Sequence, residues 1–467
     1  MEVISNQECQ EIVKNYIGHS NFKILDYKLR PFGENVDGFL GEHISILVKL
    51  LDLNNKIEKD IKFFAKRFPF GQELMAQYCM DVNAFIREMD FYERVLKQIS
   101  EDIPNCDLSF TGKYCFGRKN DIVVFEDITT KGYTMVEQAN SGIFDDQHIK
   151  LALKALAKFH TTSFAYEETN QNKKVTDLFS VEIFEPIFST PDSLGFKYLV
   201  ASFKGLSTLI DERPQDEAIR EEFKEKLIKL RNDISFKLNN PNKSRNILCH
   251  GDLWANNFMF KYNNGVPVDC KLVDFQLLKY CSPAFDVLFL IFMTTDRKVR
   301  QYHFHDFIYY YYNCLQEQLS QLNLDINTIW SKKQFKEAID EYLPVIKLNC
   351  ANQVSMIGGN SEYMKKLTAE KEEFKKFVFE DRSPYIKELY RDDENYRMLL
   401  DEALLELKEV LFTPEVSVED CFELINNYLG SENYELIDLN VDINLIKVTI
   451  IHNQEEKKLT FPLKKQL

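Results

Sequence analysis

The chain has 467 residues, 45% of them hydrophobic, and a formal charge of −15 at pH 7. This size supports a large core in two or more lobes, and the acidic balance argues against nucleic acid or anionic membranes as partners. The N-terminus lacks the features of a secretory signal, the longest apolar run (284–293) is shorter than the roughly 20 residues of a membrane span, and the ten cysteines are scattered, so a cytoplasmic protein with reduced thiols is expected.

The N-terminal part is predicted to form a small α+β unit. Residues 44–50 and 61–68 have strand character, and an Asn-Asn turn lies between them. Residues 71–99 show helical spacing, and the apolar stretch 121–125 predicts a further strand. Together these elements make up this unit, which takes in roughly the first 130 residues.

Two charged residues of this unit are candidates for positioning the phosphates of a nucleotide. Lys66 lies on the second strand and could contact the α- and β-phosphates of ATP, although an exposed strand lysine is an equally plain reading. Glu88 shares a helix face with Phe85 and Tyr92, so it should point into the small lobe, whereas Asp90 falls on the opposite side. Because an inward charge needs a partner, we expect Glu88 to pair with Lys66.

A glycine-rich stretch precedes the first of these strands. Gly33, Gly38 and Gly41 could let the backbone approach phosphates, because no Cβ blocks the contact. Their spacing matches neither the dinucleotide fingerprint nor the Walker loop, and an ordinary glycine-rich turn explains them equally well.

The stretch Phe125, Glu126, Asp127 and Ile128 follows an apolar strand and precedes the helical half. A chain that connects two lobes must pass there, and its free backbone amide and carbonyl could pair with adenine. The alternative is an acidic strand end without a ligand.

The remainder of the chain is predicted to be mostly helical. Mixed Lys/Glu runs in its last part are typical of solvated helix faces. Helices are expected at 147–163, 215–238, 279–295, 304–319 and within 361–412, and short strands at 245–249 and 271–275.

Two short motifs carry the main functional signal: Leu-Cys-His-Gly-Asp-Leu-Trp-Ala-Asn-Asn at 248–257 and Leu-Val-Asp-Phe-Gln at 272–276. Phosphoryl transfer needs a carboxylate to accept the proton of the attacking hydroxyl, for which Asp252 is the candidate. It also needs an amide and a second carboxylate to hold Mg²⁺, and Asn257 and Asp274 supply them. Either motif alone could be a turn, but their order and spacing together favour the chemistry.

Two polar residues near these motifs are assigned structural roles. His250 is expected to hydrogen-bond backbone and shape the catalytic loop rather than act as the base. Asp286 interrupts an apolar helix start, and a buried carboxylate there demands donors such as the backbone amides of the catalytic loop. No His/Cys cluster has zinc spacing.

The end of the chain contains a shortened repeat of its beginning. Residues 8–18 return as 420–430, and 461–465 resemble 63–67, but the second copy is fourteen residues shorter between these anchors and lacks the glycines of 33–41. It therefore has no phosphate loop and no catalytic loop. It is an evolutionary remnant, a gene-model artefact or a small element docked on the main body.

Together, these motifs resemble those of the insect ecdysteroid-kinase-like proteins, a branch of the choline-kinase and aminoglycoside-phosphotransferase superfamily. Gln276 in place of the glycine of protein kinases, and the absence of an Ala-Pro-Glu segment, favour this branch over protein kinases. The resemblance covers roughly residues 8–412 and rests on Asn35 in the glycine loop, Ala65–Pro69, Glu88–Tyr92, Phe125–Ile128, Leu156–His160, His250–Asn257 and Val273–Gln276.

The resemblance implies a bilobal, protein-kinase-like α+β fold. It has an N-lobe of antiparallel sheet plus helix (1–127), a large helical C-lobe (128–412) and then the truncated repeat (413–467). It implies ATP-dependent, Mg²⁺-assisted phosphorylation of a small-molecule alcohol, such as an ecdysteroid, related steroid or xenobiotic. The implied roles are catalysis by Asp252, Mg²⁺ binding by Asn257 and Asp274, and nucleotide binding by Lys66, Glu88, Gly33, Asn35, Gly38 and Phe125–Ile128.

Two alternatives remain open at this point. Choline or another amino alcohol is the competing acceptor, and the many Phe and Tyr residues of the helical half suit either kind of substrate. A non-catalytic binding module is the competing class of protein. The absence of stabilisation by Mg²⁺·ATP would favour it over a kinase. The oligomeric state is not predicted.

Overall fold

The structure is a computed structural model of the chain. It describes residues 3–32, 41–136, 142–171, 173–183, 185, 193–213, 216–239, 245–359, 361–412, 434–441, 445–452 and 455–462.

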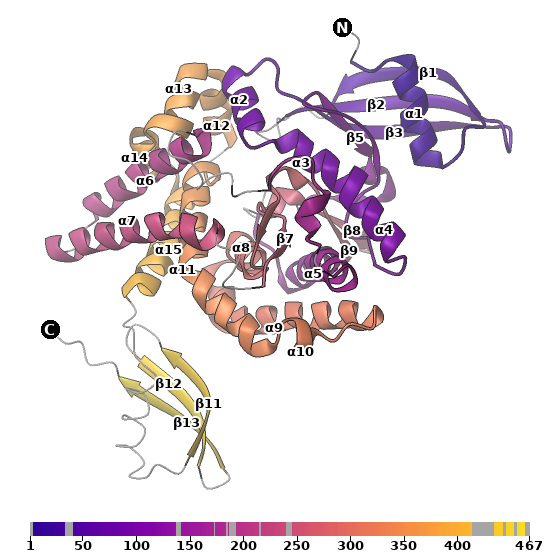
Figure 1. Ribbon diagram of the computed structural model, residues 1–467. Helices are drawn as coiled ribbons and strands as arrows, with labels where there is room; N and C mark the ends of the chain where they lie inside the picture. The colour runs from indigo at the N-terminus through magenta and orange to yellow at the C-terminus, as the bar shows by residue number, and fades with distance from the viewer. Residues whose placement is uncertain are drawn as a thin grey trace.

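The N-terminal lobe is a five-stranded antiparallel sheet in the order β1-β2-β3-β5-β4, with helix α1 packed against it (Figure 1). A capping box between Ser5 and Glu8 starts α1, and Gly18, with φ +83°, ends it. The elements are α1 (Asn6–Ile17), β1 (Phe22–Pro31), β2 (Glu42–Asp52), β3 (Ile57–Arg67), α2 (Glu73–Asp81), α3 (Ala84–Asp90), a π-helical stretch (Phe91–Leu96), α4 (Lys97–Asp102), β4 (Tyr114–Arg118) and β5 (Ile122–Glu126).

The single helix predicted over 71–99 is divided in the structure. Helix α2 ends at Asp81, and Asn83 takes a left-handed conformation with φ +54° before α3 begins. Helix α3 then runs through the π-helical stretch into α4 without interruption. In the π-helical stretch, Phe91 stacks on Phe275 at 4.4 Å between ring centres, which fastens the helix carrying Glu88 to the second lobe.

The C-terminal lobe is mostly helical and contains two small antiparallel sheets, β6-β8-β9 and β7-β10. Its strands are β6 (Tyr133–Thr134), β7 (Ile247–Cys249), β8 (Phe258–Asn263), β9 (Val266–Leu272) and β10 (Lys279–Cys281). Its helices are α5 (Asp146–Thr169), α6 (Leu194–Glu212), α7 (Glu217–Asn239), α8 (Ala284–Thr294), α9 (Arg297–Gln321), α10 (Ile326–Ile329), α11 (Lys332–Ile357), α12 (Ser361–Ala369), α13 (Lys371–Lys375), α14 (Ser383–Asp392) and α15 (Glu394–Phe412), with short 3₁₀ turns at Ile128–Lys131, Val175–Leu178, Ala255–Asn257 and Phe275–Leu277 and a π-helical turn at Lys376–Glu380.

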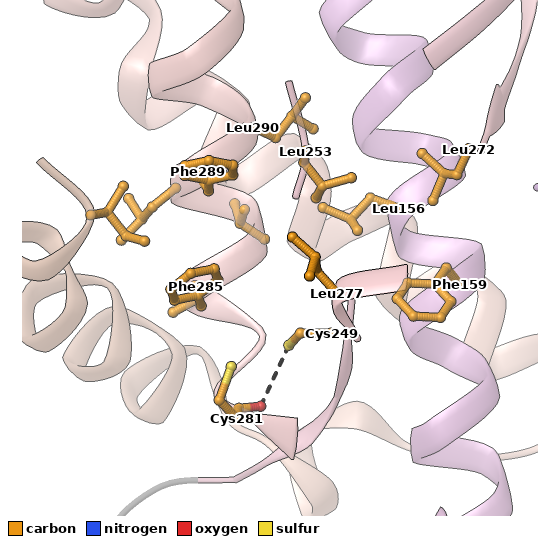
Figure 2. Packing of buried hydrophobic residues seen from close by; sticks show 14 of the residues in the cluster. Leu156, Phe159, Cys249, Leu253, Leu272, Leu277, Cys281, Phe285, Phe289 and Leu290 are labelled. Carbon is orange, nitrogen blue, oxygen red and sulfur yellow. Dashed lines mark hydrogen bonds between the residues drawn. The ribbon is translucent and has the colours of Figure 1, made fainter. Parts of the chain in front are cut away.

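The core of this lobe lies directly beneath the motifs at 248–257 and 272–276. Figure 2 shows Leu156 and Phe159 of α5 on one side and Phe285 and Phe289 of α8 on the other. These side chains are fully buried. The backbone that carries the polar site residues is therefore supported by close-packed apolar side chains.

The bilobal α+β architecture expected from the sequence is confirmed, but one boundary near the site differs. Residues 279–295 were expected to form one helix, whereas Lys279–Cys281 form β10 and α8 starts only at Ala284. The physical reason is that β10 pairs with β7, with Lys279 opposite Cys249, and Pro283 then occupies the N-cap of α8.

Strands are also present in the C-terminal repeat. β11 (Tyr434–Val441), β12 (Leu445–His452) and β13 (Glu455–Pro462) form an antiparallel sheet. The pairing of β11 with β12 slips between Leu436 and Asp438. The pairing of β1 with β2 slips between Ile24 and Asp26, the positions that match in the repeat. The second sheet thus reproduces the irregularity of the first.

Among the described residues, no helix is long and apolar enough to cross a bilayer. The nine cysteines in the described part of the chain are buried free thiols.

Candidate active site

The structure brings Lys66, Glu88 and Asp274 into contact. Lys66, near the end of β3, lies 3.1 Å from both carboxylate oxygens of Glu88 on α3. Its Nζ is also 2.7 Å from Oδ1 of Asp274 in the second lobe. Glu88 additionally accepts the backbone amide of Phe275 at 3.0 Å. One buried ammonium group thus joins the sheet lobe, its helix and the loop of the helical lobe.

Burial and charge act against each other in this cluster. Burial alone would lower the pKa of Lys66, but attraction to Asp274 and Glu88 outweighs it, so the pKa is raised and the lysine stays charged. Burial raises the pKa of Glu88 to about 7, against the opposing pull of Lys66. The pKa of Asp274 is lowered, because the attraction of Lys66 outweighs burial.

Asp274 and Asn257 are held next to each other by the backbone. The amide of Val273 donates to the carbonyl of Asn257 at 3.1 Å, which joins the two loops. Asp274 itself adopts a left-handed conformation with φ +70°, which is uncommon for a residue with a side chain. Strain of this kind persists where the surroundings fix the backbone, and here it directs the carboxylate toward Lys66.

Asp252 and Asn257 are linked within the catalytic loop. The Asn257 amide nitrogen donates to the backbone carbonyl of Asp252 at 2.6 Å and to its carboxylate at 3.0 Å. Burial, followed by repulsion from Asp274, raises the pKa of Asp252 to about 6, although the hydrogen bond from Asn257 opposes the shift. A carboxylate of this kind is ionised at neutral pH and is a stronger proton acceptor than an ordinary aspartate.

Asp286 anchors the start of the catalytic loop from below. Its Oδ2 accepts the backbone amide of His250 at 2.6 Å, and its Oδ1 accepts the amide of Gly251 at 3.0 Å. His160 lies 3.1 Å from the same carboxylate through Nε2, and its Nδ1 is 2.6 Å from the hydroxyl of Tyr311. These are the backbone donors expected for a buried carboxylate at this position.

The ligand atoms of His160, Cys249 and Asp286 lie within 4.8 Å of one another. Both oxygens of Asp286 already accept backbone amides, and the thiol of Cys249 donates to the carbonyl of Cys281 at 3.5 Å (Figure 2). Hydrogen bonding therefore accounts for this group without a metal.

The His250 ring bridges the two loops. Its Nε2 is 3.0 Å from the carbonyl of Val273, and the ring lies 4.8 Å from that of Phe275. Burial lowers its pKa, so the ring is neutral and donates to the carbonyl. Its contacts are those of a loop-shaping residue.

The connection between the lobes corrects one expectation. Phe125 lies within β5 and pairs there with Phe64 of β3. The backbone amide of Glu126 donates to the carbonyl of Lys113 at 2.9 Å, and that of Asp127 donates to the carbonyl of Lys62 at 3.3 Å. The expectation of free amides is therefore wrong at Glu126 and Asp127, because pairing between the sheet strands uses both.

The Asp127 side chain also has a structural partner. Its carboxylate accepts the amide of Thr129 at 3.0 Å and so caps the turn that starts at Ile128. It also forms an ion pair with Lys62 at 2.8 Å. Gly33, Asn35 and Gly38 lie outside the described residues.

Three buried charged residues beside the site were not found from the sequence: Arg87, Glu185 and Lys279. Lys279 carried a signal, since it is a lone cation at the start of the apolar stretch that leads into 284–293. Its partner Glu185, 2.5 Å from its Nζ, lies 94 residues earlier without any motif. Arg87 adjoins Glu88 but was not singled out.

A lysine on the sheet lobe that reaches a carboxylate loop of a helical lobe, next to a paired aspartate and asparagine, defines a phosphotransferase of the small-molecule kinase class. The model of the ecdysteroid kinase-like family matches residues 35–324, more than half of the chain. The chain therefore belongs to that family.

The solved structures that match this chain share little sequence with it. The choline kinase LicA from Streptococcus pneumoniae is 14% identical, with 72% of this chain and 100% of that chain covered and a TM-score of 0.31. The GDP complex of wild-type aminoglycoside 2′-phosphotransferase-IIIa is 13% identical (87% and 99% covered, TM-score 0.35). A microcompartment-associated aminopropanol kinase is 11% identical (87% and 96% covered, TM-score 0.36). No curated protein matches the chain.

Proposed function

We propose that this protein transfers the γ-phosphoryl group of ATP to a hydroxyl group of a small molecule, with Asp252 as the residue that accepts or orients the hydroxyl proton. The observation that carries the proposal is the contact of Lys66 with both Glu88 and Asp274, at 3.1 and 2.7 Å. An inter-lobe lysine held in this way places a cation where the phosphates of ATP must lie.

The donor set fits Mg²⁺. Carboxylate and amide oxygens are the ligands that this ion prefers, and Asp274 and Asn257 supply one of each from two hydrogen-bonded loops. The side-chain nitrogen of Asn257 donates to Asp252, so the side-chain oxygen is the atom that would bind the cation. When bound, Mg²⁺ would neutralise charge on the phosphates. We propose that the connection Phe125–Ile128 contacts adenine at Ile128 and that Gly33, Asn35 and Gly38 contact the phosphates.

The chain's own residues account for the remaining steps. Lys66 orients the phosphates, and Glu88 keeps it in position. Asp252, with its pKa of about 6, is ionised at neutral pH and can take the proton of the attacking hydroxyl. Asn257 holds that carboxylate in place through its amide hydrogen bond.

For the acceptor, we propose an alcohol of the ecdysteroid class or a related steroid or xenobiotic. Family membership supports this choice over choline and other amino alcohols. Transfer of ³²P from labelled ATP should be measured across steroids, amino alcohols and plant glycosides. The proposal predicts labelled steroid product, and labelling of amino alcohols alone would contradict it.

Asp252→Asn and Asp274→Ala test the two loops of the site in this assay. Both should abolish transfer, while Asp306→Asn, at a largely exposed position on α9, should not. Failure of Mg²⁺·ATP to raise the melting temperature of the wild type would instead favour a non-catalytic binding module.

A further inference from the structure

The turn that follows Asp274 is held at both ends by neighbouring residues of α3. Glu88 accepts the amide of Phe275 at 3.0 Å. Arg87, the preceding residue, donates from Nη1 to the carbonyl of Leu278 at 2.8 Å and is fully buried. Arginine is rarely so buried unless it is paired. A single turn of helix in the sheet lobe thus fixes a whole segment of the helical lobe.

Lys279 follows Leu278 in the chain and packs against the catalytic loop at Gly251. A Cβ added to Gly251 would lie only 2.6 Å from Cε of Lys279, so the two are in close contact. The Lys279 ammonium is 4.3 Å from the centre of the Phe285 ring, and the residue is 2% exposed. Because Gly251 immediately precedes Asp252, a shift of Lys279 would move the catalytic carboxylate.

Glu185 supplies the counter-charge for Lys279. Its Oε2 is 2.5 Å from Nζ of Lys279, and the two side chains are 1% and 3% exposed. The same carboxylate acts on Arg87: burial lowers the pKa of Arg87 to about 10, and Glu185 is the strongest of the charges that oppose this shift. The Glu185 carboxylate thus pairs with Lys279, and its charge also favours the buried cation Arg87 of the other lobe.

We propose that Arg87, Glu185 and Lys279 form a positioning network that couples α3 to the catalytic loop. Helix α3 holds Lys66 through Glu88 and the Leu278–Lys279 backbone through Arg87. A displacement of α3 that breaks the lysine contact must also release the support of Gly251 and Asp252. The nucleotide side and the acceptor side of the site are thereby set together. The kinetic consequence rests on the proposed function, whereas the coupling itself does not.

The two tryptophans of the chain allow a test that needs no activity. Trp254 lies in the catalytic loop. Trp330 is 1% exposed and packs against Phe335, with 4.9 Å between ring centres, so it serves as an internal reference in the helical lobe. After labelling with 5-fluorotryptophan, the ¹⁹F spectrum should show two resonances, and a Trp254→Phe variant assigns them.

Arg87→Met should shift or broaden the Trp254 resonance and leave that of Trp330 in place, because the link to the Leu278 carbonyl is lost. Arg87→Lys should restore the wild-type spectrum in large part, since its ammonium can still donate. A structural role without coupling would not produce this pattern of loss and rescue. The double variant Lys279→Ala with Glu185→Gln should give the same Trp254 change, because it removes the ion pair behind Gly251.

Glu406→Gln provides a matched control, because Glu406 forms another buried ion pair with Arg300, at 3.1 Å, in the helical lobe. This variant should leave Trp254 unchanged. In Mg²⁺·ATP hydrolysis, Arg87→Met should lower kcat about tenfold or more without changing KM for ATP, as removal of supporting residues commonly does.

An unchanged Trp254 resonance in folded Arg87→Met and in the double variant would overturn the network, as would equal shifts of both tryptophans. A wild-type protein that shows no phosphoryl transfer would refute the proposed function, while the ¹⁹F spectra would still decide the coupling.

Discussion

Replacement of Lys66 by methionine removes the cation between Glu88 and Asp274. Loss of one partner of a buried ion pair generally costs about 3–5 kcal/mol, because the remaining charge stays dry. Here the Asp274 side chain is 30% exposed and can be hydrated, whereas Glu88 is 1% exposed. We therefore expect the lower end of that range, about 3 kcal/mol, which is a factor of more than about 100 in the unfolding equilibrium.

This loss should depend on pH through Glu88. Its pKa is already raised to about 7 by burial, and without the pull of Lys66 it should rise further. The folded variant then binds a proton that the unfolded chain, with an ordinary carboxyl pKa near 4.5, does not bind. Stability of the variant should therefore fall as pH increases up to its folded pKa. Because Glu88 of the wild type also gains a proton as pH drops through about 7, the loss relative to the wild type is full above the folded pKa of the variant and shrinks as pH decreases to about 7.

Urea unfolding measures this effect, with tryptophan fluorescence and circular dichroism as the signals. It is carried out at pH 8, 6.5 and 5, values chosen to bracket a pKa of about 7. Lys49→Met is the matched control, because Lys49 on the neighbouring strand β2 forms an exposed pair with Glu58 at 2.9 Å. It should change stability little at any pH. A similar loss in both variants, or a loss for Lys66→Met that does not vary with pH, would refute the reasoning.

Asp252→Asn should abolish phosphoryl transfer but keep the rise in melting temperature with Mg²⁺·ATP, because the amide cannot take a proton, whereas Asp274→Ala should lose both. Transfer by the wild type should decline as pH drops below about 6, the raised pKa of Asp252, since the carboxylate must be ionised; a flat pH–rate profile between pH 5 and 8, the range that brackets about 6, would contradict this. Gly251→Ala should lower both melting temperature and turnover, because φ is +82° and the new Cβ would collide with the Leu277 carbonyl. Gly265→Ala, with φ +79° and open space around it, should cost only about 1 kcal/mol of backbone strain, and comparable effects of the two variants would contradict the packing argument.

The sequence was sufficient to predict the partners of residues whose orientation follows from local geometry. The helical spacing of Glu88 relative to Phe85 and Tyr92 indicated the inward direction in which it meets Lys66. Asp286 in an apolar helix start required donors, and the nearest backbone amides are those that it accepts. In both cases, the cost of an unpaired buried charge restricts the choice to partners supplied by the fold.

Features that depend on distant pairing could not be predicted in the same way. The amides of Glu126 and Asp127 are used because of the register of the sheet, and no local pattern contains that register. The helix break at Asn83 depends on one left-handed residue. Glu185 faces Lys279 only because the chain folds back over 94 residues, and neither residue has a spacing that indicates the other.

The duplicated sheet bears on how the chain reaches its native state. β13 corresponds to β3, whose end is the partner of β5 in the N-terminal lobe. During synthesis, β1–β3 leave the ribosome first, so β3 can pair with β5 long before the second copy is made. In refolding from denaturant both copies are present at once, and we expect β13 to compete with β3 for β5. Removal of residues 413–467 should therefore speed refolding in the test tube and have little effect on the yield of newly made protein.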